Sequence, residues 1–366
     1  MKICIVGDAG SVHIKRWVDS LVLKGHTIDV ISEEYNALDN AKVHVLFKSG
    51  VPKGKLIRAI KGGIRTRKII KSIKPDIVHA HYLTTYGFYV SASGFHPLVV
   101  SPWGSDLLID PKKSKFLKAI VQFVLKRADA VSAMGKPFNQ ALTELGCDKK
   151  KLFTLRISSV DTSKFHPLTR SITNKDFSVL SARWFKLNYN VDVFIKAIPH
   201  VLKRIKNVKF TVIGSGVLED ELKNLSKELG VSDNVLFVGE VDHKDMPKYL
   251  ANSDLFVDTF VSKSGSDKTL LDKTSGIGNT TLEAMACGTP VLLSNKYKMK
   301  GCPYVTYKAL DSHDLANKII ELLQNQKMRK QITVESREFV MRNADEASNM
   351  QKWEDFYAMI INKNDQ

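Results

Sequence analysis

At 366 residues the chain is too long for one typical hydrophobic core and suits two, and its 43% hydrophobic and 25% charged residues are typical of a soluble globular protein. No apolar run approaches the roughly 18 residues that a membrane-spanning helix needs, and the four scattered cysteines lack metal-ligand spacing, so we expect reduced thiols and a cytoplasmic protein. The formal net charge of +17 predicts an anionic partner, which can be nucleic acid, anionic lipid or a phosphorylated substrate.

The first half of the chain alternates short apolar runs with amphipathic segments. Residues 2–7 form the first run, which Gly7-Asp8 ends, so we expect no signal peptide there. Similar strand-like runs follow at residues 27–32, 76–81, 98–102 and 130–134, with amphipathic segments between them at residues 14–23 and 116–127. Strands separated by helical segments are typical of an α/β fold with a parallel sheet.

Two segments of this half concentrate the basic charge, residues 48–74 and residues 112–127. No acidic residue lies between Lys48 and Lys74, and isoleucine and leucine interleave with the basic residues. Such a basic amphipathic surface is typical of contact with an anionic membrane, but the same periodicity is typical of surface helices that pack on their own lobe. Nucleic acid is less favoured, because the interleaved aromatic residues of a strand-binding platform are missing.

The second half begins a new cycle of strands and helices. Its strand-like runs lie at residues 177–182, 208–214, 235–239, 255–259 and 290–294, and helices are predicted at residues 191–205, 218–229 and 315–323. Residues 344–361 form a helix whose apolar face can pack back on the first half. We therefore expect two Rossmann-like, doubly wound lobes, residues 1–168 with the C-terminal helix 344–366, and residues 169–343.

Three glycine-containing turns lie where such sheets bind ligands, at residues 7–11, 214–216 and 275–279. The first lacks the spacing of a dinucleotide fingerprint, so a nicotinamide dehydrogenase is poorly supported. The third leads into GNTTLEAMACGTPV, residues 278–291, where a Gly-Asn turn opens a helix. Unpaired amides at such a helix start suit a diphosphate. Glu283, in the first turns of this helix, can accept hydrogen bonds from ribose hydroxyls. Alternatively, its negative charge simply interacts favourably with the helix dipole.

Residues 278–291 resemble the signature of glycosyltransferase family 4, a family of retaining enzymes with the two-lobed GT-B architecture. The resemblance extends over nearly the whole chain, in the segments 76–81, 103–106, 160–167, 214–222, 234–239 and 246–257. It implies two lobes that face across a cleft, and transfer of a sugar from a nucleotide diphosphate donor.

In that family an arginine and a lysine six residues apart grip the donor diphosphate. Arg183 matches the arginine, but the position six residues later is Tyr189, so Lys186 is the candidate replacement. Ser275 stands where the family has a second glutamate that meets the sugar hydroxyls. The resemblance further implies donor-binding roles for Gly10, Ser11, Gly214, Gly278, Asn279, Thr280 and Glu283.

Catalysis of this kind depends on stabilising the departing diphosphate with a helix N-terminus and fixed cations. The catalytic candidates, including those on the acceptor side, are Arg183, Glu283, His79, His81 and Asp106. Trp103 occupies the position before Gly-Ser-Asp where the family often has a histidine. No Asp-x-Asp pair occurs, so we expect no metal, and no cofactor beyond the nucleotide diphosphate sugar that serves as donor substrate.

We therefore expect a cytoplasmic glycosyltransferase, peripheral on the inner face of the membrane, that acts on a glycan or lipid-linked acceptor in cell-surface polysaccharide or glycolipid synthesis. The replacements at Tyr189, Trp103 and Ser275 also suit a sugar-nucleotide-binding protein that has lost catalysis. A nucleic-acid-binding protein is the third alternative, and only the net charge favours it.

Overall fold

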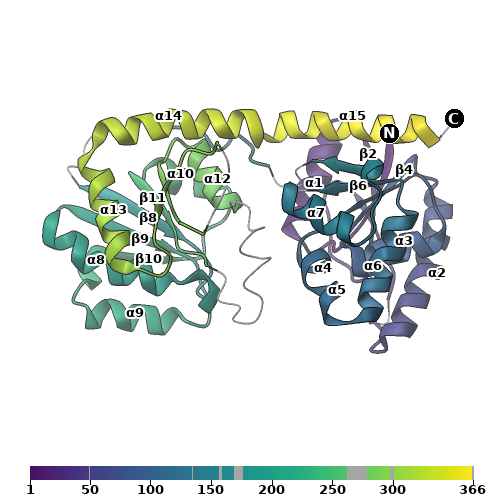
Figure 1. Ribbon diagram of the computed structural model, residues 1–366, viewed down its shortest axis with the longest axis horizontal. Coiled ribbons are helices and arrows are strands. Elements are labelled where there is room, and N and C mark those ends of the chain that lie inside the picture. Colours follow the sequence, from purple (N-terminus) through teal and green to yellow (C-terminus); the bar gives the residue numbers. More distant parts are fainter. Residues whose placement is uncertain are drawn as a thin grey trace. The chain divides into compact units, whose positions relative to one another are not determined.

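The computed structural model describes residues 1–48, 50–133, 135–155, 159–168, 176–261, 278–296 and 301–364. The chain divides into two compact units, each with its own parallel sheet (Figure 1). The first unit comprises Met1–Ser158 with Ala347–Gln366, and the second comprises Ser159–Glu346. Two α/β units therefore replace the single core that a chain of this length cannot form, as the alternating pattern predicts.

The first unit contains a seven-stranded parallel sheet in the order β3-β2-β1-β4-β5-β6-β7. Its strands are β1 (Lys2–Val6), β2 (Thr27–Ser32), β3 (Lys42–Val45), β4 (Ile77–His81), β5 (Leu98–Ser101), β6 (Ala130–Ala133) and β7 (Leu152–Thr154). The strand order reverses between β1 and β4, so the carboxyl ends of these two strands mark the place where sheets of this type bind ligands.

Helices cover this sheet and close its core. They are α1 (Val12–Leu23), α2 (Lys55–Ile73), α3 (Phe88–Ser93), α4 (Ser105–Leu108), α5 (Asp110–Lys113), α6 (Lys115–Arg127) and α7 (Lys136–Glu144), with a π-helical turn η1 at Leu83–Gly87. The last helix, α15 (Glu346–Asn364), returns to this unit. Its buried Trp353 and Tyr357 pack with Trp17 and the strand residue Ile5. The predicted packing of a C-terminal helix on the first lobe is confirmed.

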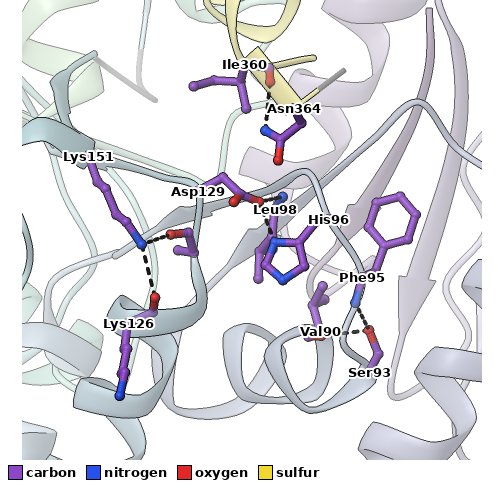
Figure 2. Close-up of polar contacts among 11 residues, drawn as sticks. Val90, Ser93, Phe95, His96, Leu98, Lys126, Asp129, Lys151, Ile360 and Asn364 are labelled. Carbon is purple, nitrogen blue, oxygen red and sulfur yellow. Dashed lines mark hydrogen bonds and ion pairs between the residues drawn. The ribbon is translucent and has the colours of Figure 1, made fainter. Parts of the chain in front are cut away.

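Polar contacts fasten the edge of the first sheet where β5 and β6 begin (Figure 2). The carboxylate of Asp129 accepts hydrogen bonds from the amide of Leu98 and from Nδ1 of His96, both at 2.7 Å. The ammonium of Lys151 donates to the carbonyl oxygens of Lys126 at 3.0 Å and Ala128 at 2.6 Å, where α6 ends. These contacts occupy the amino-terminal edge, and the opposite, carboxyl-terminal edge carries the predicted ligand turns.

The second unit contains a six-stranded parallel sheet in the order β10-β9-β8-β11-β12-β13. Its strands are β8 (Phe177–Ala182), β9 (Val208–Ile213), β10 (Val235–Gly239), β11 (Leu255–Asp258), β12 (Val291–Ser294) and β13 (Val305–Tyr307). Its helices are α8 (Val191–Arg204), α9 (Glu219–Glu228), α10 (Met246–Ala251), α12 (Asn279–Ala286), α13 (Ser312–Gln324) and α14 (Gln326–Asn343). Here the order reverses between β8 and β11, so a ligand site is expected at their carboxyl ends.

The segment from Ser159 to Leu168 packs with the second unit, although the sequence placed it in the first lobe. Val160 and Phe165 are buried in the same apolar cluster as Leu180 and Met285. The amide of Val160 also donates to the carbonyl of Ala344 at 2.8 Å. The division between the units therefore comes at Ser158 rather than at residue 168, because these apolar side chains bury against the second core.

The two basic segments differ in how far their apolar side chains are buried. In α6, Val121, Val124 and Leu125 are buried in the lobe's own core. The first half of α2 instead presents Leu56, Ile57, Ile60 and Ile64 to solvent, each more than half exposed. Among the helices that the structure describes, none is long and apolar enough to cross a bilayer.

Candidate functional site

Arg183 lies at the carboxyl end of β8 in the second unit, where the strand order reverses. Its Nε donates to Oδ1 of Asp258 at 2.8 Å, and a terminal guanidinium nitrogen donates to the other carboxylate oxygen. The same nitrogen donates to Oγ1 of Thr281 at 3.2 Å. Because Asp258 ends the neighbouring strand β11 and Thr281 lies in α12, Arg183 ties together three elements at the ligand edge of the sheet.

The Asp258 carboxylate is completely buried yet remains ionised. Burial alone would raise its pKa, but the charge of Arg183 and the hydrogen bonds from Arg183, the amide of Phe260 and Thr281 hold the pKa of Asp258 below its usual value. A paired, bidentate guanidinium is held in one orientation. Arg183 is therefore a fixed cation at the edge of the site rather than a mobile surface side chain.

The start of α12 lies directly against Arg183. Gly278 is the N-cap and offers no side-chain cap, so the first amides of the helix carry its positive end. A Cβ added at Gly278 would come within 3.3 Å of a guanidinium nitrogen of Arg183, closer than the usual packing distance. A helix N-terminus beside a fixed guanidinium is an arrangement that suits the two phosphates of a nucleoside diphosphate.

Glu283 is 3% exposed and borders a cavity of about 380 Å³. Its Oε1 lies 2.9 Å from Nε2 of His243, whose own side chain is half-exposed. The residues that line this cavity include Arg183, Gly214, Glu240, His243, Thr280 and Glu283. Four of the predicted donor-binding residues, Arg183, Gly214, Thr280 and Glu283, thus line one hollow.

Gly214 and Gly216 let the turn after β9 lie directly on the loop of Arg183. Gly214 has a φ of +141°, and a Cβ there would stand 2.0 Å from the carbonyl oxygen of Arg183. A Cβ at Gly216, with a φ of +149°, would stand 2.6 Å from the carbonyl oxygen of Phe185. No other residue type fits this approach, so these glycines position the cavity wall.

The predicted catalytic histidine His79 is inside the core of the first unit. It is fully buried, with Nδ1 2.6 Å from the Tyr357 hydroxyl and Nε2 2.6 Å from Oγ of Ser101. Burial lowers the pKa of His79 well below its usual value, so the ring is neutral. It also stacks on Trp353, with ring centroids 5.1 Å apart. This environment gives His79 a structural role, as the link between β4 and α15.

The carboxylate of Asp106 is also fully buried, and it fastens two loops. It accepts hydrogen bonds from the amides of Leu83 at 2.7 Å, Trp103 at 2.9 Å and Gly104 at 2.9 Å. Burial raises the pKa of Asp106 to about 6, against the opposing effect of these amides. The side chain joins the loops after β4 and β5, and it lines neither of the two first-unit cavities described below.

His81, by contrast, borders a cavity of about 280 Å³ at the carboxyl ends of β1 and β4. Its Nδ1 accepts a hydrogen bond from the indole N–H of Trp103 at 3.2 Å, and burial lowers the pKa of His81 to about 3. Ser11, the N-cap of α1, lines the same cavity, while Gly10 is exposed and its amide donates to Asp8 at 2.9 Å. Among the candidates His79, His81 and Asp106, His81 is the one that lines either of the two first-unit cavities described here.

Comparison with known proteins identifies the family of the chain. A profile of Glycosyl transferase 4-like proteins matches residues 2–134, and a profile of Glycosyl transferases group 1 matches residues 169–339. The chain belongs to the group 1 glycosyltransferases. The resemblance noted in the sequence is thereby confirmed, and the protein is a glycosyltransferase enzyme.

Solved structures show that this glycosyltransferase has the GT-B fold. A glycosyltransferase from Rickettsia africae matches at a TM-score of 0.79 with 17% identity, over 98% of both chains. HepE from Anabaena, solved in complex with UDP and glucose, matches at a TM-score of 0.74 with 17% identity, over 98% of this chain and all of that one. At such identities the likeness concerns the fold, and it confirms the predicted pair of Rossmann-like lobes.

One curated relative shares more sequence over a shorter stretch. The GDP-mannose-dependent monoacylated alpha-(1-6)-phosphatidylinositol monomannoside mannosyltransferase of Corynebacterium glutamicum is 34% identical over 145 residues. The match covers 37% of this chain and 36% of that protein, so the chain spans about a third of the relative's length.

The residues that the sequence analysis marked as departures from the family pattern lie as follows. Tyr189, at the place of the lysine, lines the cavity, and its carbonyl oxygen accepts a hydrogen bond from Thr259 at 2.6 Å. The exposed Lys186 lies with its ammonium 5.4 Å from the ring centre of Trp184. Asn279 begins α12. Ser275 lies outside the described residues.

Sequence reasoning missed several residues of both hollows. Asp258 lies 75 residues along the chain from its partner Arg183. His243 lies 40 residues from its partner Glu283. Asp258 carried a signal, because it is an acidic residue at the end of a buried strand beside the switch point. No sequence signal indicated His243, or Glu33 and Arg58 in the first unit, because their neighbours along the chain form no motif.

Proposed function

We propose that this glycosyltransferase holds a nucleotide diphosphate sugar in the cavity of the second unit and transfers the sugar, with retention of configuration, to a glycan or lipid-linked acceptor. The observation that carries the proposal is the convergence of Arg183, the N-terminus of α12 and Glu283 on one hollow. Binding of UDP by HepE and the lipid acceptor named for the mannosyltransferase relative support it. The cellular process is the synthesis of a cell-surface polysaccharide or glycolipid.

The reaction breaks the bond between the sugar carbon and the diphosphate oxygen and forms one to the acceptor oxygen. Positive charge from the N-terminus of α12 and from Arg183 stabilises the departing diphosphate. The acceptor proton passes to the departing phosphate oxygen, so this proposal requires no separate protein base. Glu283, oriented by His243, accepts hydrogen bonds from the ribose hydroxyls.

We propose that the transfer requires no metal ion and no further cofactor. Among the described residues no group of three or more His, Cys, Asp and Glu side chains is arranged to hold a metal ion. Charge stabilisation is then assigned to Arg183 and the α12 N-terminus, and the proposal is open to direct test with a chelator.

A second candidate is a nucleotide-sugar-binding protein without transferase activity. Of the described residues that line the cavity, Arg183 and His243 are the only basic ones. Arg183 already neutralises Asp258, so less positive charge is available to the leaving group than a second cation would supply. Hydrolysis of the bound donor in the absence of acceptor distinguishes an active enzyme from this alternative.

The first test is a thermal-shift and calorimetry screen against UDP, GDP, ADP, CMP and their common sugars, with EDTA present throughout. We expect one nucleoside diphosphate to raise the melting temperature. At a hundred times its Kd, such a ligand raises the free energy of unfolding by about 2.7 kcal/mol. Glu283→Gln should weaken that binding by about 1–3 kcal/mol. Glu228→Gln, on the far end of α9, is the matched control.

Three results would count against the proposal. If folded protein bound no nucleotide of the panel, the assignment of the donor site would be wrong. Binding that appears only when Mg²⁺ or Mn²⁺ replaces EDTA would overturn metal independence. Binding of a donor without either its hydrolysis or its transfer would favour the second candidate.

A further inference from the structure

Two cavities adjoin in the first unit, each of about 280 Å³. One is the hollow beside His81, and the other is a groove between α2, α3 and α6, helices that are neighbours in Figure 1. Both are lined by Arg58 and Thr85, so they meet at these two side chains. We infer, resting on the proposed function, that the acceptor is an amphiphile whose uncharged hydroxylated head lies in the hollow and whose apolar chain lies in the groove.

His81, which lines the hollow, contains a buried ring nitrogen without a hydrogen-bond partner among the described residues. Because the indole of Trp103 donates to Nδ1 of His81, that nitrogen carries no proton, and a neutral imidazole then has its proton on Nε2. Nε2 has no hydrogen-bond partner among the described residues, and the side chain is 2% exposed. A buried donor without a partner is costly, and this group makes the His81 side of the hollow polar.

The charged side chains of the hollow disfavour an anionic head. Arg58 donates through Nε to Oε1 of Glu33 at 2.6 Å, and the hydroxyl of Tyr89 donates to the same oxygen at 2.6 Å. Arg58 and Glu33 therefore neutralise one another, and Asp8 leaves the described lining with a net negative charge. A phosphate or carboxylate would be repelled, whereas the hydroxyls of a sugar or polyol match the remaining hydroxyl and carboxylate groups.

The lining of the groove combines apolar side chains with the charged side chains of Arg58, Asp110 and Lys113, of which Asp110 and Lys113 form an ion pair at 3.0 Å. Its lining includes Ala59 of α2, Phe88 of α3, and Phe116, Leu117 and Ile120 of α6. Glycines bring α2 close to α3, since a Cβ at Gly62 would stand 2.4 Å from the ring of Tyr89. The groove ends among side chains that are more than half exposed, among them Phe116. A hydrocarbon chain attached to the head is the occupant that fits both the groove and its junction with the hollow.

The test is calorimetric binding of methyl, hexyl and octyl glycosides of glucose, galactose and mannose, and of glycerol ethers, each below its critical micelle concentration. Each methylene that becomes buried should improve affinity by up to about fourfold, from the roughly 0.8 kcal/mol per methylene. We expect at least one octyl compound to bind at least tenfold more tightly than its methyl counterpart. Octyl phosphate should bind more weakly than that compound.

Phe116→Ser should remove most of the chain-length gain and leave binding of the methyl compound unchanged. Leu23→Ser is the control, because Leu23 is an exposed apolar residue of α1 in the same unit that does not line the groove among the described residues. The inference is overturned by affinity that ignores chain length, by tighter binding of octyl phosphate, or by equal loss in both variants. Nucleotide binding measured on the same samples reports separately on the proposed function.

Discussion

Arg183 has two roles in the second unit, and they constrain each other. Its guanidinium faces the cavity that we assign to the donor, and it also neutralises the buried carboxylate of Asp258. Removing one partner of a buried ion pair leaves an unpaired charge, which costs more than the pair itself contributes. A loss of nucleotide binding in Arg183→Ala is therefore interpretable only when the folding of the second unit is measured beside it.

We expect Arg183→Ala to lower the free energy of unfolding by about 3–5 kcal/mol, while Arg183→Lys lowers it less because it keeps the charge. Because Asp258 has a lowered pKa in the folded state, its stabilisation is complete above the ordinary carboxyl pKa and is lost as the pH falls through the lower, native pKa. Urea unfolding of the wild type and of Asp258→Asn, compared between neutral and acidic pH, measures this.

The exposed Asp233→Asn is the control for that series and should change the free energy of unfolding by less than about 0.5 kcal/mol at neutral pH. The Asp258→Asn variant should show a smaller acid-induced loss than the wild type. An Arg183→Ala protein as stable as Asp233→Asn would show that the ion pair does not hold the site together.

At the scale of single elements, α15 anchors the far end of the chain to the first sheet. Trp353 is completely buried and stacks on His79 of β4, and Tyr357 hydrogen-bonds to the same ring. The helix thus packs against β4, the strand that also contains His81. Packing on this helix therefore fixes the acceptor-side strand, although no residue of α15 is part of the hollow that we describe.

We expect Trp353→Ala to lower the free energy of unfolding by about 3–5 kcal/mol, as loss of a large buried aromatic side chain usually does. Tyr357→Phe removes only the hydroxyl and should cost about 1 kcal/mol. Met359→Ala, on an exposed side of the same helix, is the control. Urea unfolding followed by circular dichroism measures all three, and equal values for Trp353→Ala and Met359→Ala would contradict the anchoring role.

At the scale of the whole molecule, part of the excess of basic residues lies beside exposed apolar side chains on α2. The exposed part of α2 combines Leu56, Ile57, Ile60 and Ile64 with basic residues such as Lys61 and Lys68. Basic residues near an anionic surface contribute about 1 kcal/mol each. We propose that this helix brings the enzyme to the inner face of the cytoplasmic membrane, beside the groove assigned to the acceptor chain.

We expect sedimentation with phosphatidylglycerol vesicles, and much weaker sedimentation with phosphatidylcholine vesicles, falling as salt is added. The double variant Lys61→Ala, Lys68→Ala should bind about 2 kcal/mol more weakly. Lys327→Ala with Lys330→Ala on α14 removes the same charge from exposed positions of the second unit and is the control. Equal binding to both lipids, no binding to either, or equal loss in both double variants would contradict membrane docking by α2.

The sequence alone indicated most of the strands, the two lobes and the family, but it did not indicate β3, β7 or β13. Strand and helix periodicities are local properties, so the alternation of apolar runs predicted both sheets, and the apolar face of residues 344–361 predicted the return of α15. The strings around Gly214 and Gly278 are contiguous, so they could be recognised without knowing which strands are neighbours. Glu283 was predicted from its place within the Gly278 string, and Arg183 from its match to the family arginine directly after the strand-like run 177–182.

Only the tertiary structure decided which side chains meet. The contact of Arg183 with Asp258 depends on β8 lying beside β11, and that of Glu283 with His243 spans 40 residues. The alternation along β4 could not tell that His79 contacts a helix from the other end of the chain, while His81 borders a cavity. Burial and partnership are set by packing between distant segments, and a local sequence pattern does not contain that information.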